Sequence, residues 1–528
     1  MKKNLRKLAA LLLTGTMVLG TGTTTLAKEA PAPAAEISDE QVVIAISAEP
    51  NSLVPDVAFL SNYISAITSL IYEPLIDTEY STVELYDTGL VTAWEDIDDT
   101  HFQLTLREGV KFQNGEEFTS EDVYYQFEQG TQGAQTDHYG LFDMSGFEII
   151  DDYNIIICTK YPWAQAKELL GFSTFMAVSK TELEKAGGAG VTAQYLENAG
   201  TGKYRFKEWV PGEYILLERN EDYWNQDDLG YFKEVKFVFI TDAAARAMAV
   251  QSGDADIALD CQVSDYELYN GLDGVKAEIS QSGTVQTLFL NDNGGPCSNE
   301  LVREAIYNLI DKEAIREVAN SGFGDICDTV ISINGPMSDG ICESAGKGTD
   351  VEKAKALLEE AGYTADADGM YLTLKMRGQQ TNALMSMIQE ELRLGGINVE
   401  LELAETPVHF AALAEGDYDM YTSSQQFGYY SETVRCCDGI AYDWSDVMGG
   451  CGYKSDEMHE IATRCLQTFD IEERKAAYAE FQQYFRDHYV SVALYTGVLL
   501  SVADEDIEGI GLYSVGCYYL ADMYSTAR

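Results

Sequence analysis

Residues 106–128, LREGVKFQNGEEFTSEDVYYQFE, constrain the fold most, because strand-like apolar positions, a turn and a helix start follow one another within one short segment. Asn114-Gly115 is a strong signal for a tight turn. Thr119 stands three residues before Asp122, so its hydroxyl can cap a helix whose positive end faces the carboxylate. The segment therefore predicts a strand, a turn and a capped helix in that order.

Three further segments with turn or helix signals follow in the chain. They are residues 201–224 (TGKYRFKEWVPGEYILLERNEDYW), 241–258 (TDAAARAMAVQSGDADIA) and 288–315 (LFLNDNGGPCSNELVREAIYNLIDKEAI). In this order, the four segments resemble family 5 of the extracytoplasmic solute-binding proteins, whose members carry oligopeptides, dipeptides, nickel or some sugars to ABC importers. The resemblance implies an α/β class, with a two-lobe periplasmic-binding-protein-like fold, an extra inserted subdomain, mixed sheets and a Venus-flytrap hinge.

The first 27 residues have the pattern of a secretory signal peptide. Basic residues precede the apolar run LAALLLTGTMVLG, and Thr25-Leu26-Ala27 is a suitable cleavage site. Residues 28–40 are expected to form a flexible leader. Many members of the resembled family are lipoproteins anchored through a Cys, but Thr21 stands at that position here. We therefore expect an exported protein, extracellular or associated with the cell envelope, without a conventional lipobox anchor.

The net charge of −52 excludes some partners. A nucleic-acid backbone or an anionic lipid surface would be repelled by such a field, whereas cations and cationic peptides would be attracted. An acidic shell also keeps an exported protein soluble, so the charge alone does not describe a binding pocket. We expect a monomer that binds a small molecule or a peptide and no nucleic acid.

The ten Cys residues favour disulfides over a metal site. Cys436-Cys437, followed by Cys451 and Cys465, lacks the paired spacing of common zinc sites, and no His stands near enough to complete a ligand motif. No metal and no cofactor are therefore expected. The first choice for a local disulfide is Cys327–Cys342, whose closed loop of about 15 residues could stabilise the fold by up to ~3 kcal/mol.

No catalytic motif is recognisable in the chain. It has no Gly-x-Ser-x-Gly elbow, no His-Glu-x-x-His helix and no phosphate loop ending in Lys-Ser or Lys-Thr. With 87 acidic residues, some pair of carboxylates must lie within glycosidase distance by chance. A binding protein without catalytic residues is therefore expected, and a secreted hydrolase stays a distant alternative.

The resemblance also implies how the chain is divided. The expected parts are the signal peptide 1–27, the leader 28–40, lobe one in 41–72, 196–285 and 490–528, an inserted subdomain of lobe one in 73–195, and lobe two in 286–489. The two crossings, near Gln286 and Val490, are expected to act as the hinge.

Lobe two shows the alternation of helix and strand that is typical of an α/β fold. Thr349 and Glu352 form a candidate capping box for a helix in residues 350–363, DVEKAKALLEEAGY, and Gly362 is its stop signal. A second helix over 381–396 precedes the alternating strand INVELEL.

The candidate ligand contacts follow from the resemblance and from side-chain chemistry. Peptide-binding members of the resembled family hold the ligand amine with an Asp in a segment like Trp-x-x-Asp-Tyr-x-Asp-Pro, and the matching residues 423–439, SSQQFGYYSETVRCCDG, lack the Asp-Pro pair. Glu432 lies next to the missing position and is expected to take the ammonium contact. Further candidates are Asn51 and Ser52 for polar contacts, Tyr429 and Tyr430 for stacking, Trp444 for an apolar wall, and Arg435 or Arg377 for a carboxylate.

Three functions stay open from the sequence. Capture of a peptide for the membrane permease of an ABC importer is preferred, capture of an oligosaccharide or a metal chelate is the alternative, and hydrolysis is the distant third. An aromatic-lined pocket without a charged pair would favour a sugar. Paired acidic and basic ends would favour a peptide.

Overall fold

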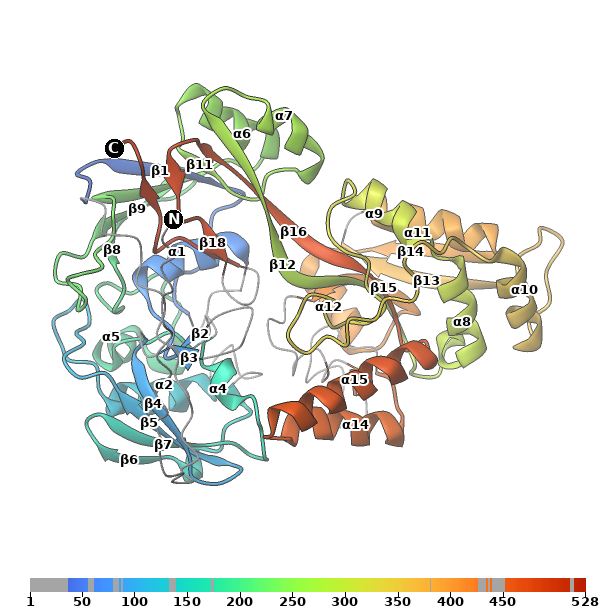
Figure 1. The fold of residues 1–528 in the computed structure, drawn as a ribbon, viewed down its shortest axis with the longest axis horizontal. Coiled ribbons are helices and arrows are strands. Elements are labelled where there is room, and N and C mark those ends of the chain that lie inside the picture. The colour runs from blue at the N-terminus through green and yellow to red at the C-terminus, as the bar shows by residue number, and fades with distance from the viewer. Residues whose placement is uncertain are drawn as a thin grey trace, which may run out of the picture.

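Two long strands connect the two bodies of the molecule (Figure 1). The computed structural model describes residues 37–55, 61–78, 85–86, 89–132, 139–171, 175–379, 381–425, 434, 437–438, 452–512 and 517–528. The connecting strands are β12 (Val275–Leu290) and β16 (Val492–Asp504). They pair antiparallel along most of their length, with a register shift between Gln281 and Val285. The two bodies therefore share one continuous sheet of ten strands.

The first body contains both the first strand and the C-terminal segment. Its part of the large sheet consists of β1 (Gln41–Ile46), β8 (Tyr204–Val210), β9 (Tyr214–Arg219), β10 (Glu234–Phe239) and β11 (Ile257–Ala258). Its helices are α1 (Asn62–Ile71), α6 (Ala243–Ser252), the 3-10 turn η4 (Val263–Asp265) and α7 (Tyr266–Asn270). The short C-terminal strands are β17 (Ile507–Glu508), β18 (Gly511–Leu512), β19 (Tyr518–Tyr519) and β20 (Tyr524–Ser525). β1 pairs parallel with both β10 and β11.

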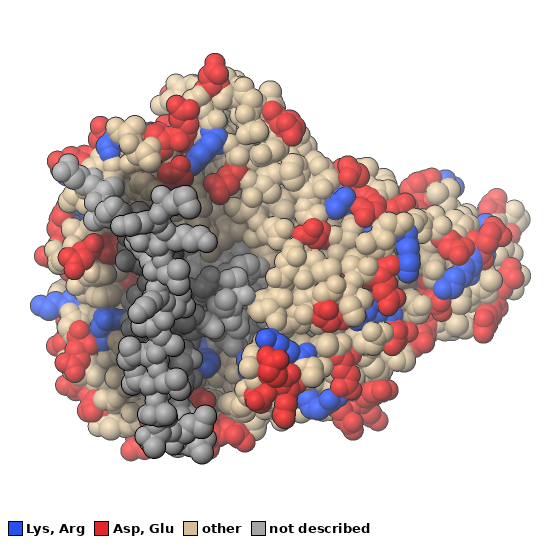
Figure 2. Space-filling view, in the orientation of Figure 1, with Lys and Arg blue, Asp and Glu red and all other residues tan. Residues whose placement is uncertain are grey.

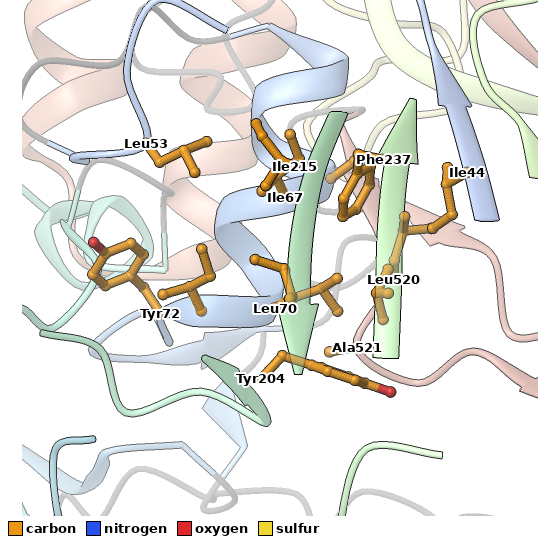
Figure 3. Close-up of a cluster of buried hydrophobic side chains, with 14 of the residues drawn as sticks. Ile44, Leu53, Ile67, Leu70, Tyr72, Tyr204, Ile215, Phe237, Leu520 and Ala521 are labelled. Carbon is orange, nitrogen blue, oxygen red and sulfur yellow. The ribbon is translucent and has the colours of Figure 1, made fainter. Parts of the chain in front are cut away.

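The core of the first body lies between α1 and the sheet (Figure 3). Ile67 and Leu70 of α1 are fully buried in one cluster with Ile215 of β9 and Phe237 of β10. Leu520, from the C-terminal segment, belongs to the same cluster. Full burial of a side chain of this size stabilises the fold by roughly 1.5–3 kcal/mol. Segments from both ends of the described chain are therefore needed to complete this core.

A second, smaller sheet extends the first body after α1. Its antiparallel order is β4 (Val91–Asp96), β5 (His101–Leu106), β7 (Asn154–Cys158) and β6 (Glu148–Asp151). The other elements of this part are β2 (Asp77–Thr78), β3 (Leu85–Tyr86), α2 (Ser120–Gly130), η1 (Met144–Gly146), α4 (Ala166–Leu169), α5 (Lys180–Ala186) and η3 (Gly188–Gly190).

The turn and the capped helix predicted for residues 106–128 are confirmed. Gly115 has a φ of +89°, which a glycine adopts without the steric cost of a side chain. The backbone N–H of Thr119 donates to Asp122 Oδ2 at 3.0 Å, within a capping box at the start of α2. Because these features involve residues close in sequence, local patterns were enough to predict them.

The second body places helices beside its part of the large sheet. Its strands are β13 (Leu372–Gly378), β14 (Ile397–Leu403) and β15 (Met420–Gln425). Its helices are η5 (Pro296–Ser298), α8 (Glu300–Leu309), α9 (Lys312–Ala319), α10 (Val351–Glu360), α11 (Ala383–Leu394), α12 (Thr406–Ala414), α14 (Asp456–Gln467) and α15 (Ile471–Asp487). The large sheet has the order β14-β13-β15-β12-β16-β11-β1-β10-β9-β8. Parallel and antiparallel pairs both occur in it, so the predicted mixed α/β architecture is confirmed.

The start of α10 differs from the prediction by one residue. Asp350, and not Thr349, is the N-cap, and its Oδ1 accepts from the backbone N–H of Lys353 at 3.0 Å. An Asp at this position also adds a negative charge at the positive end of the helix. Gly362 follows the helix with a φ of +93°, as its predicted role as a stop signal requires.

Cys327 and Cys342 are free thiols, so the structure differs from the predicted disulfide. The Cys327 thiol points to the carbonyl oxygen of Asp325 at 3.7 Å, and the Cys342 thiol points to that of Ile326 at 3.4 Å. Burial raises the pKa of the Cys327 thiol to about 12. Since the thiolate is the reactive form, burial disfavours exchange at this sulfur.

A buried carboxylate explains the Tyr-Trp box that ends residues 201–224. Tyr223 Oη donates to Glu73 Oε1 at 2.7 Å, and Trp224 Nε1 donates to Glu73 Oε2 at 2.9 Å. Burial raises the pKa of Glu73, and these two hydrogen bonds partly offset the rise. Glu73 lies just after α1, so the box holds the chain between α1 and the smaller sheet.

The molecular surface carries many acidic groups. Figure 2 shows Asp and Glu side chains over both bodies on the face in view. Among the helices of the described residues, none combines the length and the apolar character that a bilayer span requires.

A buried carboxyl between α9 and α11 makes the stability of the second body depend on pH. Glu391 of α11 is only 8% exposed, and its Oε2 accepts from the backbone N–H of Asp311 at 3.1 Å. Burial raises the pKa of Glu391 to about 7 from its ordinary value of 4.5. Between these two values the folded protein holds a proton that the unfolded chain has released. This contribution to stability is therefore greatest at low pH and is lost as the pH rises through about 7.

We predict that Glu391→Gln raises the free energy of unfolding by roughly 1–3 kcal/mol at about pH 8, because it removes a charge that burial disfavours. At about pH 5 the difference from the parent protein should nearly vanish. Urea unfolding at both pH values measures the effect. Glu390→Gln, at the exposed neighbouring position, is the control and should not stabilise. Equal stability of the Glu391 variant and the parent at pH 8 would contradict the prediction.

Candidate functional site

A cavity of about 390 Å³ lies where β12 and β16 pass between the two bodies. This volume is within the range of small-molecule sites in proteins. Its polar lining residues come from five elements and their flanks: Asn62, Ser282, Thr284, Gln286, Asn320, Asn382 and Ser424. The apolar part of the wall is formed by Ala319, Ala383, Leu384, Tyr495, Val498 and Leu499, beside the backbone of Gly497.

The described wall of the cavity is polar but uncharged. None of its lining side chains carries a formal charge, apart from any contribution of residues outside the described ranges. Burial raises the pKa of Tyr495 to about 12, so its phenol is neutral at physiological pH. Hydroxyl and amide groups can both donate and accept hydrogen bonds. The wall therefore suits the neutral polar groups of a ligand, such as peptide amides or sugar hydroxyls.

The register shift in β12 forms one side of this wall. Gly283 has a φ of +68° between Ser282 and Thr284, which places both hydroxyls on the same side of the strand. These two hydroxyls lie 2.8 Å apart, and Ser424 Oγ of β15 donates to Thr284 Oγ1 at 3.0 Å. Three hydroxyl groups from two strands thus form a cluster, which we call the hydroxyl cluster.

Gly497 of β16 leaves the space that the hydroxyl cluster occupies. A Cβ at this position would lie 2.3 Å from Thr284 Oγ1 and 2.6 Å from Ser282 Oγ. Both distances are far shorter than a van der Waals contact. The absence of a side chain at Gly497 therefore allows the two crossing strands and the hydroxyl cluster to pack together.

Two helix ends of opposite polarity also reach the cavity. Asn382 caps the positive end of α11 by accepting from the backbone N–H of Met385 at 2.9 Å. Asn320 follows the negative end of α9 and donates to the carbonyl oxygen of Phe323 at 2.7 Å. Since each end carries a partial charge, the wall is neutral in formal charge but still polarised.

The two bodies also contact each other away from the crossing strands, where the residues just before α4 reach the end of α14 and the start of α15. The backbone N–H of Ala164 donates to the carbonyl oxygen of Leu466 at 2.8 Å, and Arg474 Nη1 donates to the carbonyl oxygen of Ala164 at 3.1 Å. Tyr478 Oη donates to Gln165 Oε1 at 2.9 Å. We call this group the inter-body contact. The side chains of Gln165, Arg474 and Tyr478 are buried in this contact.

Three of the predicted ligand contacts fall within the described residues, and none of them lines the cavity. Asn51 is exposed. Ser52 is buried, and its hydroxyl lies 3.3 Å from the carbonyl oxygens of Ala193 and Gln194 in the same body. Arg377 of β13 forms ion pairs within the second body, with Glu402 at 2.9 Å and with Asp417.

The other predicted contacts lie outside the described residues. They are Tyr429, Tyr430, Glu432, Arg435 and Trp444. Their assignment to the ligand stays a prediction. Within the described residues, no group of three or more His, Cys, Asp or Glu side chains is placed to hold a metal ion.

The sequence patterns did not identify the hydroxyl cluster or Asn62. The cavity residues come from segments far apart in the chain, and each is of a residue type that is common in loops and caps. One local signal was available. Ser282-Gly283-Thr284 places a Gly inside a strand pattern, which is typical of a bulge or a close backbone approach.

Comparisons with known proteins agree with this architecture. Residues 86–434 match the family described as "Bacterial extracellular solute-binding proteins, family 5 Middle". The chain is 22% identical to the oligopeptide-binding protein AppA of Bacillus subtilis, covering 80% of this chain and 81% of AppA. It is 26% identical to the nickel-binding periplasmic protein of Escherichia coli, covering 67% and 69% of the two chains.

Solved structures show the same fold. The periplasmic binding protein DppA of Helicobacter pylori, in complex with the peptide STSA, aligns with a TM-score of 0.77 at 21% identity. The alignment covers 93% of this chain and 99% of that one. The structure of AppA from Bacillus subtilis with a nonapeptide aligns with a TM-score of 0.73 at 20% identity, covering 92% and 99% of the two chains.

We predict that Gly497→Ala lowers the free energy of unfolding by roughly 1–3 kcal/mol, because the new methyl group overlaps the hydroxyl cluster. Adding Ser282→Ala and Thr284→Ala should recover part of the loss, since these changes remove the overlapping oxygens. Urea unfolding of the single and combined variants measures this coupling. Gly348→Ala, at an exposed position with ordinary contact distances, is the control. If the changes in the free energy of unfolding of the single variants simply add in the combined variant, Gly497 and the hydroxyl cluster do not interact, and the prediction is wrong.

Proposed function

Because the chain belongs to family 5 of the bacterial extracellular solute-binding proteins, we propose that it captures a peptide between its two bodies and delivers it to an ABC importer. Members of this family are binding proteins rather than enzymes, and they work with ABC transporter permeases outside the cytoplasm. The observation that carries the proposal is the polar cavity at the strand crossing, in a two-body structure of this family.

A peptide suits the described wall of the cavity. Each peptide unit presents one N–H donor and one C=O acceptor, and hydroxyl and amide side chains can pair with both. AppA, a relative across most of the chain, is named for oligopeptide binding, and the DppA structure contains a tetrapeptide written STSA. These relatives support a peptide ligand without specifying its length or sequence.

A neutral oligosaccharide is the second candidate, because no formal charge is found in the described wall. Sugar hydroxyls would use the same donors and acceptors. A metal chelate has support from the nickel-binding relative, but no metal-ligand group is present among the described residues.

The proposed mechanism is closure of the two bodies over the ligand. The register shift beside Gly283 and Gly497 is the proposed hinge, because the regular pairing of β12 and β16 is interrupted there. Residues 41–72, 196–285 and 490–528 would form lobe one, 73–195 its inserted subdomain, and 286–489 lobe two. Closure buries the ligand and forms the inter-body contact.

The proposal includes the cellular form of the protein. Residues 1–27 would act as the export signal, and Thr21 replaces the Cys of a conventional lipobox, so the mature protein would lack that lipid anchor. It would act as a monomer that binds no nucleic acid, in keeping with its strongly acidic composition.

We predict that the purified protein binds one peptide per chain and does not turn it over. Native mass spectrometry with synthetic di- to pentapeptides, maltose-type oligosaccharides and nickel–histidine chelates distinguishes the candidates. A mass increase equal to one intact peptide is expected. Binding of the oligosaccharides alone, or of the chelates alone, would replace the peptide proposal. Steady release of a hydrolysis product would contradict a function restricted to binding.

We also predict that Tyr478→Phe weakens ligand binding by roughly 5- to 100-fold, because Gln165 Oε1 loses its donor in the closed state but can bond to water in the open state. Calorimetry with the peptide identified above measures the affinity, and small-angle X-ray scattering measures the open fraction. Tyr153→Phe is the control, since Tyr153 bonds to Glu117 within the same body. Unchanged affinity and shape in the Tyr478 variant would show that the inter-body contact does not stabilise closure.

A further inference from the structure

The two bodies have a second contact, on the opposite side of the crossing strands from the inter-body contact. Phe323, in the loop after α9, packs edge-to-face against Tyr266 at the start of α7, with 5.3 Å between the ring centroids and 77° between the ring planes. Figure 1 shows α7 and α9 on one side of β12 and β16, and α4 and α15 on the other. The ring pair and the inter-body contact therefore lie on opposite sides of the proposed hinge.

The backbone of the loop after α9 holds Phe323 in this position. Ser321 has a φ of +54°, and Gly322 and Gly324 have φ values of +78° and +81°. The left-handed conformation is disfavoured for Ser321, which carries a side chain, and such conformations persist only where the surroundings determine them. Asn320 Nδ2 also donates to the carbonyl oxygen of Phe323 at 2.7 Å. The loop therefore presents Phe323 in one fixed direction.

The same loop is attached to the crossing strands at their register shift. The backbone N–H of Thr496 in β16 donates to the carbonyl oxygen of Asp325 at 2.8 Å, and the backbone N–H of Asp325 donates to Thr496 Oγ1 at 2.8 Å. Gln281 Nε2 of β12 donates to Asp325 Oδ2 at 3.1 Å. A Cβ on Gly324 would lie 2.2 Å from the carbonyl oxygen of Thr496, so only a glycine allows this approach. A change of angle at the register shift therefore acts directly on the loop.

The loop also forms part of the cavity wall. Ala319 and Asn320 line the cavity, and the hydrogen bond from Asn320 to the carbonyl oxygen of Phe323 joins this wall to the ring pair. On the other side, Tyr266 packs against a buried cluster of the first body that includes Leu500 of β16. The ring pair is thus supported by both bodies.

A rotation about the crossing strands has opposite effects at the two contacts. Separation of the bodies at the inter-body contact brings α7 and α9 closer together, because they lie on the other side of the strands (Figure 1). The rings of Tyr266 and Phe323 already have the spacing of a contacting edge-to-face pair. One of the two rings must therefore leave its position before the bodies can separate.

We propose that Tyr266 and Phe323 form a stop behind the hinge, which opposes separation of the two bodies and so favours the arrangement that encloses a ligand. The inference rests on the proposed capture of a ligand between the bodies, and it adds the element that sets how easily they separate. A binding protein must open to take up and to release its ligand, so the strength of this ring pair sets a balance between affinity and release. One aromatic pair changes such an equilibrium by roughly 2- to 10-fold.

The test follows an amide whose hydrogen bond joins the two bodies. The backbone N–H of Ala164 donates to the carbonyl oxygen of Leu466 at 2.8 Å, so its hydrogen exchange reports how often the inter-body contact opens. In the ligand-free protein, Phe323→Ala should speed this exchange by roughly 2- to 10-fold. Phe323→Trp should slow it, because a larger ring meets Tyr266 at a smaller angle of opening.

Two controls separate opening from a general loss of stability. The backbone N–H of Ala177 donates to the carbonyl oxygen of Glu73 at 2.8 Å within the first body, and its exchange should stay unchanged in every variant. Tyr124→Ala removes one ring of a similar edge-to-face pair, 6.2 Å from Phe147 in the same body, and should keep the parent rate at Ala164.

A variant on the opposite body tests the same pair. Tyr266→Ala should speed exchange at Ala164 as Phe323→Ala does, and the combined variant should exchange no faster than either single one, because each change removes the same interaction. Both rings are partly exposed, so the variants are expected to fold, which their melting curves verify.

Binding is measured on the same variants with a pool of synthetic tri- to pentapeptides, by titration followed with native mass spectrometry. Phe323→Ala should weaken binding of the pool by roughly 2- to 10-fold, because the enclosing arrangement becomes less populated. Phe323→Trp should strengthen it.

The outcomes distinguish the stop from the proposed function. Faster exchange at Ala164 in both Phe323→Ala and Phe323→Trp would show that the rings only pack, and would overturn the stop. Unchanged exchange in Phe323→Ala and in Tyr266→Ala would also overturn it, and peptide binding by the parent protein would still support the proposed function. Opposite shifts in the two Phe323 variants, without peptide binding to any protein, would support the stop and overturn the peptide proposal. Opposite shifts with matching changes in affinity support both.

Discussion

The pairing of β12 with β16 is the interaction on which the rest of the structure depends. The strands of the first body attach to β16 through β11, and those of the second body attach to β12 through β15. Without this central pair the ten-stranded sheet would separate into two. The ladder is interrupted at the register shift beside Gly283, so the most deformable part of the connection coincides with the wall of the cavity. A change of angle between the bodies would therefore alter the shape of the cavity directly.

Local features of the fold could be predicted from the sequence, whereas the site could not. The capping box of Thr119 and Asp122 involves two residues three positions apart, and its geometry is nearly independent of the rest of the chain. The cap of α10 moved by one residue, because Asp350 and Thr349 are both suitable caps and only the path of the chain decides between them. The cavity depends on long-range packing. Nothing near Asn62 in the sequence indicates that Asp260 lies beside it.

The acidic surface and the uncharged side chains of the described cavity wall have different physical roles. A net charge of −52 acts over distances comparable to the screening length and affects which solutes approach the protein. Selection at short range depends instead on hydrogen bonds in the cavity, where each unpaired polar group has a free-energy cost. Arg377 illustrates this difference. Its ion pairs with Glu402 and Asp417 lie within the second body, and its side chain does not line the described wall of the cavity.

The position of Leu520 in the core of the first body has a consequence for biosynthesis. Domains generally fold as units during translation, beginning with the N-terminal one. Here β1 and α1 are made early, but the cluster that holds Ile67 and Leu70 is complete only when Leu520 has been added. The whole second body is thus synthesised before the first can close its core. Strands β9 and β10 can cover the apolar face of α1 earlier, but the part of the cluster that contacts the C-terminal segment stays incomplete for about half of translation.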